Sequence, residues 1–123
     1  MKPVVYGCAG SSSAAQLANH LAVRLDRAGK AKMSCIAGVG GDVEPLVRVA
    51  RSGRPVVAID GCPLHCVKAC LARHGVEASL HVTLADLGVA KKNGVDFDPL
   101  QADAVFTDLA SRLDALEPPR RQG

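Results

Sequence analysis

The amino-acid sequence predicts an α/β fold: a single three-layer domain around a four-stranded, mostly parallel, Rossmann-like sheet in the order 2-1-3-4. Short apolar runs alternate with amphipathic segments along the chain, which is the pattern of parallel strands joined by helical crossovers. The length of 123 residues corresponds to one domain, and hydrophobic residues make up 48% of the chain, which is enough to build a core. We expect residues 1–117 to form this domain and residues 118–123 to be a disordered tail.

The first strand and the helix after it have the clearest sequence patterns. The run Val4 to Gly7 is apolar and is followed by a loop rich in glycine and serine. Ser13 and Gln16 have the spacing of a capping box, which predicts the start of a helix that ends before Gly29. Its apolar face has a leucine at every fourth position, at Leu17, Leu21 and Leu25. This face is suited to covering one side of a sheet.

Two further strands are predicted in the middle of the chain. The second covers Lys32 to Ala37 and ends in the run Gly38 to Gly41, which we interpret as a flexible turn. Asp42 is a suitable N-cap for a short helix that reaches Ser52. The third strand, Pro55 to Ile59, is wholly apolar, as expected for a strand that is buried on both faces of a parallel sheet.

The last part of the chain is predicted to contain one strand between two helices. Pro63 is placed as the first residue of a helix that ends near His74, and the fourth strand lies within Ala78 to Leu84. Residues 86–98 are predicted to form a loop. The final helix starts at Asp98, and its apolar face is formed by Val105, Leu109, Leu113 and Leu116.

Composition and charge exclude several classes of function. The formal net charge is only +3, and the basic pairs Lys91-Lys92 and Arg120-Arg121 are predicted to lie in a solvated loop and tail. Aromatic residues make up 2% of the chain, so few side chains could stack on bases, and we expect no nucleic-acid partner. No apolar run approaches the roughly 18 residues that span a bilayer. We expect a soluble, cytoplasmic protein with no membrane partner.

Four of the five cysteines lie where predicted strands end. Cys8 follows the first strand, Cys35 lies in the second, and Cys62 and Cys66 follow the third. The carboxyl ends of parallel strands share one edge of the sheet, where such folds bind ligands. In a reducing compartment, cysteines in such a domain are more plausible as metal ligands or reactive thiols than as disulfides. The pair Cys62 and Cys66 has the spacing of zinc ligands, so we predict a four-cysteine zinc site at this edge.

Three residues near these cysteines are candidates for other roles. Cys70 lies one helical turn beyond Cys66 and is interpreted as a core residue, with metal ligation or a resolving thiol as the alternative. His65 could ligate the metal, although its helical position turns it toward solvent. Asp60 has two interpretations of equal weight: a supporting contact to the metal-bound sulfurs, or a turn residue that makes its own hydrogen bonds.

Two other functions would use the same cysteines. A thiol-based redox or sulfur-transfer protein would use Cys62 or Cys66 as a reactive thiolate, which Cys70 or Cys8 resolves. An iron–sulfur cluster could occupy the same four-thiolate cage. The sequence lacks a C-x-x-C pair, an HExxH motif and a serine nucleophile elbow. Four thiolates leave no open position on zinc, which favours metal homeostasis or an accessory role over an enzyme.

The order of these motifs resembles that of the bacterial DGC-domain proteins. The resemblance covers the chain from about Val4 to Leu87, and it rests on the Gly/Ser-rich loop after Cys8 and on the segments Gln16-Leu17-Ala18-Asn19, Cys35 to Gly41, Asp60-Gly61-Cys62-Pro63 with Cys66, and Asp86-Leu87-Gly88. The family takes its name from the Asp-Gly-Cys motif and is described as zinc-binding through four cysteines. The resemblance leaves Cys70 outside the pattern and implies a ligand role for Cys8, Cys35, Cys62 and Cys66.

Overall fold

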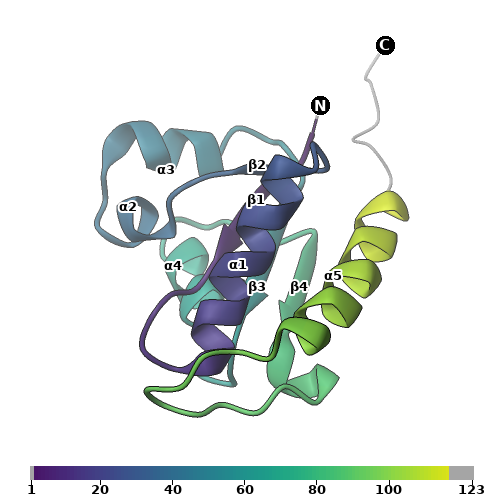
Figure 1. Ribbon diagram of the computed structural model, residues 1–123. Coiled ribbons are helices and arrows are strands. Elements are labelled where there is room, and N and C mark those ends of the chain that lie inside the picture. The colour runs from purple at the N-terminus through teal and green to yellow at the C-terminus, as the bar shows by residue number, and fades with distance from the viewer. Residues whose placement is uncertain (1, 117–123) are drawn as a thin grey trace.

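A four-stranded parallel sheet lies at the centre of the protein, shown in Figure 1 as a computed structural model that describes residues 2–116. The strands are β1 (Val4–Gly7), β2 (Lys32–Met33), β3 (Val56–Asp60) and β4 (Leu80–Thr83). Their order across the sheet is β2-β1-β3-β4, and every neighbouring pair is parallel. The predicted α/β fold and strand order are therefore confirmed.

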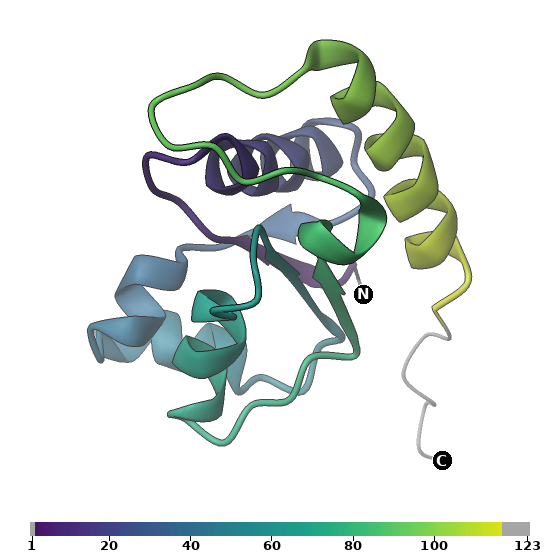
Figure 2. The same ribbon diagram turned by 90° about the horizontal axis from the view of Figure 1, so that it is seen from below.

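Helices cover both faces of the sheet and give the protein three layers (Figure 2). On one face, α1 (Ser13–Arg27) and α5 (Pro99–Asp114) pack against Val5, Val57, Ile59 and Val82. On the other face, α2 (Ile36–Gly40), α3 (Glu44–Ala50) and α4 (Cys66–Ala72) pack against Val4, Tyr6, Val56 and Ala58. Side chains alternate between the two faces along each strand, so the sheet separates two apolar cores.

The start of α1 differs by one residue from the predicted capping box. Ser12 caps the helix, because its Oγ accepts the N–H of Ala15 at 3.1 Å. The Gln16 side chain does reach back, but its Nε2 donates to the carbonyl of Gly10 at 2.6 Å. Ser13, the predicted cap, is the first residue of the helix and is left to bind a distant loop.

The second predicted strand is wrong beyond Met33. The N–H of Ser34 donates to the carbonyl of Val5 at 3.1 Å, after which the chain leaves the sheet. The N–H of Met33 points away from β1 and donates to the carboxylate of Asp26 at 2.9 Å. This hydrogen bond satisfies the edge of the sheet locally, and the following residues form α2.

The glycine-rich run after β2 is helical and is not the flexible turn that we predicted. It lies largely in α2, where glycine at position 38 leaves room for the Leu46 side chain of α3. The predicted helix cap at Asp42 is also wrong, because Val43 precedes α3 and Asp42 has a φ of 62°. The Asp42 carboxylate instead accepts hydrogen bonds from the Arg73 guanidinium at 2.9 and 2.7 Å, which ties the α2–α3 connection to the end of α4.

The ion pair between Asp42 and Arg73 predicts a pH-dependent contribution to stability. Its hydrogen bonds to the guanidinium lower the pKa of Asp42 in the folded protein. Because the pKa of Asp42 is lower in the folded than in the unfolded protein, its ionised carboxylate stabilises the fold at pH values above the unfolded pKa. This stabilisation is lost as the pH falls through the folded pKa. In urea unfolding, we expect Asp42→Asn to be less stable than the wild type at neutral pH. The difference should shrink below about pH 4. Arg73→Gln should show the same convergence, and a difference that does not change with pH would contradict this account.

The segment from β3 to α5 follows the prediction except at one helix start. α4 begins at Cys66 and not at Pro63, because residues 62–65 form a turn in which the His65 N–H donates to the Cys62 carbonyl at 3.2 Å. The short 3-10 helix η1 (Leu84–Leu87) follows β4, and Asp98 caps α5 as predicted. The tail predicted at 118–123 lies outside the described residues. Within residues 2–116, no helix combines the length and the apolar character needed to cross a membrane.

Candidate functional site

The loops after β1 and β3 leave the carboxyl edge of the sheet toward opposite faces. The helix after β1, α1, covers one face, whereas the helix after β3, α4, covers the other (Figure 2). In open α/β sheets, ligands bind at such a switch between neighbouring strands. Cys8 follows β1 and Cys62 follows β3, and the Cys8 sulfur accepts the N–H of Gly61 at 3.2 Å. The two loops therefore meet directly at a cysteine.

Asp60 anchors the start of α4 from the end of β3. The residue is 1% exposed, and its carboxylate oxygens accept the backbone N–H groups of Val67 and Lys68 at 2.8 and 3.2 Å. The Nε2 atom of His81 on β4 lies 2.8 Å from the same carboxylate. These are not the local turn hydrogen bonds of one interpretation, because the N–H groups lie seven and eight residues along the chain. The other interpretation, a supporting contact to metal-bound sulfurs, stays a prediction. The carboxylate thus joins β3, β4 and α4 next to residues 61–65, which we call the cysteine loop.

Gly61 allows the cysteine loop to lie against the start of α1. A Cβ atom at this position would lie 2.7 Å from the carbonyl carbon of Ala14 and 2.9 Å from the nitrogen of Ala15. Such distances are shorter than real contacts, and both neighbours are backbone atoms that cannot rotate away. Each residue of the Asp-Gly-Cys motif thus has a distinct role: Asp60 caps α4, Gly61 permits close approach, and Cys62 supplies a thiol.

This contact predicts that Gly61→Ala disturbs the cysteine loop. The added methyl group must displace the loop from α1, at a cost of about 2 kcal/mol in the free energy of unfolding. The displacement would also weaken the hydrogen bond between the Gly61 N–H and the Cys8 sulfur. Urea unfolding measures the first effect, and the alkylation rate of Cys8 measures the second. If neither the stability nor the reactivity of Cys8 changed, the loop could move away from α1 at no cost, and this account of Gly61 would be wrong.

His65 fixes the backbone immediately before Cys66. It has φ 55° and ψ 48°, a left-handed conformation that is uncommon for residues other than glycine. Its Nε2 atom lies 3.0 Å from the Thr83 hydroxyl, and its ring packs edge-on against His81 with centroids 4.9 Å apart. We predicted that this side chain turns toward solvent, but it is half-buried.

Three of the four predicted ligands share one neighbourhood. Burial raises the pKa of Cys8, whereas the hydrogen bond from Gly61 opposes this rise. A negative charge on Asp60, Cys66 or Cys62 would add to the rise in the pKa of Cys8, and Gly61, the residue before Cys62, contacts the Cys8 sulfur directly. Cys8 and Cys62 are half-buried, Cys66 is exposed, and all are free thiols. The structure therefore brings these three cysteines to the same region of the edge.

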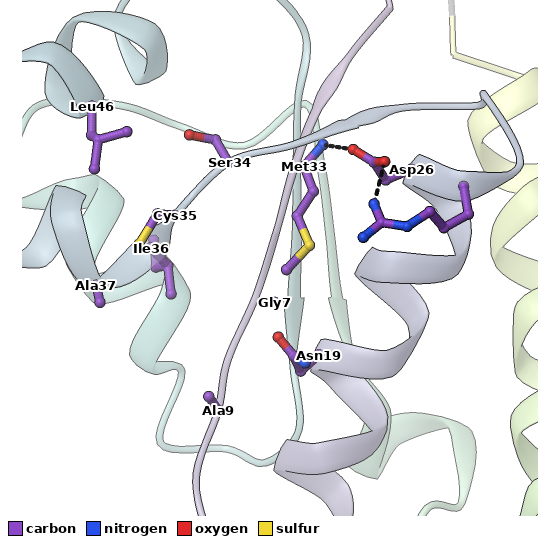
Figure 3. A pocket seen from close by; sticks show the side chains of 11 residues that line it. Gly7, Ala9, Asn19, Asp26, Met33, Ser34, Cys35, Ile36, Ala37 and Leu46 are labelled. Atoms are coloured by element: carbon purple, nitrogen blue, oxygen red, sulfur yellow. Dashed lines mark hydrogen bonds and ion pairs between the residues drawn. The ribbon is translucent and has the colours of Figure 1, made fainter.

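Cys35, the fourth predicted ligand, lies beside this region in the wall of a cavity. The cavity has a volume of about 600 Å³ and is lined by residues from α1, β2 and α2 (Figure 3). Cys35 directly precedes α2 without a capping hydrogen bond from its side chain, and Gly7 and Ala9, on either side of Cys8, line the same cavity. Burial raises the pKa of Tyr6, and the charge of Cys35 adds to that rise. Cys35 is thus next to the three-cysteine region but is not placed within it.

Cys70 lies further along α4, at the contact with α2. A Cβ atom on Gly40 would lie 2.9 Å from the Cys70 sulfur, so the glycine leaves room for this side chain. Burial raises the pKa of Cys70, and the charge of Cys66 adds to the rise. The thiol is half-buried at the contact between the two helices, and its interpretation as a core residue stays a prediction.

The cysteines fit zinc by their chemistry more closely than by their arrangement. Thiolates are preferred zinc ligands, and all five cysteines are free. Among the residues that the structure describes, no three His, Cys, Asp or Glu side chains are arranged to hold a metal ion. A four-cysteine site would require the exposed Cys66 and Cys35 to come close enough to Cys8 and Cys62 for one zinc ion to contact all four sulfurs.

Two residues beside the cysteines were not identified from the sequence. His81, which belongs to none of the motifs, contacts Asp60, and Lys91, assigned to a solvated loop, places its Nζ 3.6 Å from the Cys62 sulfur. The pairing of Asp60 with Thr83 puts His81 on the same face of the sheet, so strand register could have indicated the first contact. The second contact joins residues 29 positions apart through a loop that has no periodic pattern.

Comparison with known proteins confirms the resemblance inferred from the motifs. The sequence profile of the DGC domain matches residues 4–109. A protein of Pseudomonas aeruginosa strain PAO1, named "Anaerobic and virulence modulator AnvM", is 62% identical over 111 residues, which cover 90% of this chain and 85% of that protein. No solved structure matches the chain. The chain therefore belongs to the DGC-domain family.

Proposed function

We propose that the protein binds zinc through cysteine thiolates at the carboxyl edge of the sheet. The main support is the contact between the loops after β1 and β3, where the Cys8 sulfur accepts the N–H of Gly61, the residue before Cys62. Cys35, after β2, is the proposed fourth ligand. Four thiolates would close the coordination sphere, so the proposed role is metal homeostasis or an accessory function and not hydrolysis.

Residues around the cysteines would prepare the site without binding the metal. Asp60 holds the first turn of α4, which carries Cys66, and the Gly61 N–H donates to the Cys8 sulfur. Donors of this kind orient metal-bound thiolates and reduce the charge on sulfur. Zinc, when bound, would supply a cross-link between the loops that follow three neighbouring strands.

The relative from P. aeruginosa suggests a regulatory setting for this chemistry. That protein is named an anaerobic and virulence modulator, and it is 62% identical to this chain. We infer that this chain is also a modulator, and that it acts in the cytoplasm, where its thiols stay reduced and available to metal. In this role it would bind metal stoichiometrically and would have little turnover of its own.

A thiol-based redox or sulfur-transfer function is the second candidate. It is favoured by the ammonium of Lys91 beside the Cys62 sulfur and by the exposure of Cys66 at the start of α4. A cation or a helix N-terminus next to a thiol favours the thiolate, which is the nucleophile. In thiol exchange, the thiolate of Cys62 or Cys66 would attack a partner's disulfide, form a mixed disulfide and release the partner's other sulfur as a thiolate. This function predicts protein that is isolated without metal.

Labelling of the thiols with and without zinc separates the two functions. Reduced, metal-free protein is treated with N-ethylmaleimide, with or without an equimolar amount of zinc, and labelling at each cysteine is measured by peptide mass spectrometry. Zinc is expected to protect Cys8, Cys35, Cys62 and Cys66. Cys70, packed between α4 and α2, is the internal control and should react equally in both conditions. If zinc changed the labelling of no cysteine, and one cysteine reacted much faster than the others, the result would instead support the redox function.

A further inference from the structure

The loop before α5 is held against the start of α1 on both sides of one lysine. Ser13 is buried, and its N–H donates to the carbonyl of Lys92 at 2.8 Å. Its hydroxyl donates to the carbonyl of Ala90 at 3.2 Å and accepts the N–H of Lys92 at 3.1 Å. Lys91 lies between these two attachment points, so its backbone position is fixed by a buried side chain.

From this position Lys91 reaches the cysteine loop. Its Nζ lies 3.6 Å from the Cys62 sulfur, a hydrogen-bond distance for a sulfur acceptor. The adjacent Lys92 lines a separate hollow beside the start of α5. The two neighbouring lysines have the same side chain and charge, but the recorded contact with Cys62 belongs to Lys91, so Lys92 serves as the control.

Cys62 follows Asp60 and Gly61 in the chain, and the Gly61 N–H donates to the Cys8 sulfur, so a carboxylate and a second cysteine lie close to this contact. In a site where the cysteines bind metal as thiolates, negative charge would therefore gather around Cys62. A zinc ion bound by four thiolates would carry a net charge of −2. We propose that Lys91 is a positioning and charge-balancing residue, whose ammonium holds the Cys62 sulfur and offsets the charge of the gathered thiolates. The role in metal binding rests on the proposed zinc function, whereas the contact with Cys62 does not.

Two alkylating reagents of different charge test the contact in metal-free protein. Iodoacetate is an anion and iodoacetamide is neutral, and both react with the thiolate. The ratio of their rates at Cys62 therefore reports the local charge and not the fraction of thiolate. Lys91→Gln is expected to lower this ratio about three- to fivefold, as one unit charge at about 4 Å would in water. Lys91→Arg should restore the ratio, and Lys92→Gln, the matched control, should leave it unchanged.

Zinc affinity of the same variants gives an independent readout. In competition with a chromophoric chelator, Lys91→Gln is expected to weaken zinc binding by a similar factor, and Lys92→Gln is expected to have no effect. A protein that binds no zinc but still shows the lower rate ratio in Lys91→Gln would refute the zinc function and leave the assignment of Lys91 intact. A rate ratio unchanged by Lys91→Gln, or lowered equally by Lys92→Gln, would overturn that assignment.

Discussion

Replacing Asp60 with alanine is expected to lower the free energy of unfolding by about 3 kcal/mol, which corresponds to roughly 10 °C in Tm for a domain of this size. The carboxylate is buried and accepts the N–H groups of Val67 and Lys68, and it also contacts His81. Its removal leaves three buried or half-buried polar groups without their acceptor, and this loss costs more than the net value of an ordinary hydrogen bond. Thermal and urea unfolding measure the effect.

An exposed aspartate provides the matched control for this prediction. Asp108 pairs with Arg112 on α5, and both side chains are nearly half exposed. Exposed pairs of this kind contribute little, so Asp108→Ala should change the free energy of unfolding by less than about 0.5 kcal/mol. If Asp60→Ala changed stability no more than Asp108→Ala, the carboxylate would not be the anchor of α4 that its contacts indicate.

The second large effect is expected from replacing Cys62 and Cys66 together by serine. If both thiolates bind zinc, the double variant should fall from about one zinc per chain to nearly none, because two hydroxyl groups cannot replace two thiolates. The fold should persist, since Cys66 is exposed and Cys62 is only half-buried. Elemental analysis measures zinc, and far-UV circular dichroism confirms that the variant is folded.

Cys70→Ser is the matched control for the double variant. Cys70 lies on the same helix as Cys66, but its sulfur faces Gly40 at the contact with α2. This variant should keep its zinc. A folded Cys62→Ser/Cys66→Ser protein that kept the zinc content of the wild type would exclude both residues as ligands.

The edge strand β4 was predicted within its wider range, but the strands predicted most closely are those buried on both faces. β1 and β3 lie in the middle of the sheet, so every residue in them is buried and the sequence shows continuous apolar runs. The edge strand β2 has only two residues in the sheet. The apolar residues after it, Ile36 and Val39, pack from α2 at helical spacing. A run this short does not distinguish a strand from a helix by its periodicity, which explains the error.

The candidate site could be predicted as far as topology determines it. Parallel strands bring their carboxyl ends together, so the meeting of Cys8 with the loop of Cys62 followed from the predicted fold. The place of Cys35 depends on where β2 ends, and the error there carried over to this residue. The contacts of His81 and Lys91 depend on strand register and on the path of a loop pinned by Ser13, which residue spacing alone does not determine.

Metal content tests the central claim most directly. Protein purified under reducing conditions is analysed for zinc and iron by elemental analysis, with protein concentration measured on the same sample. The zinc account predicts about one zinc per chain and no iron. Iron with inorganic sulfide would indicate a cluster in the same cage. Protein that contained no metal and took up none when zinc was added would contradict the zinc account and leave thiol chemistry at Cys62 and Cys66 as the function of the edge.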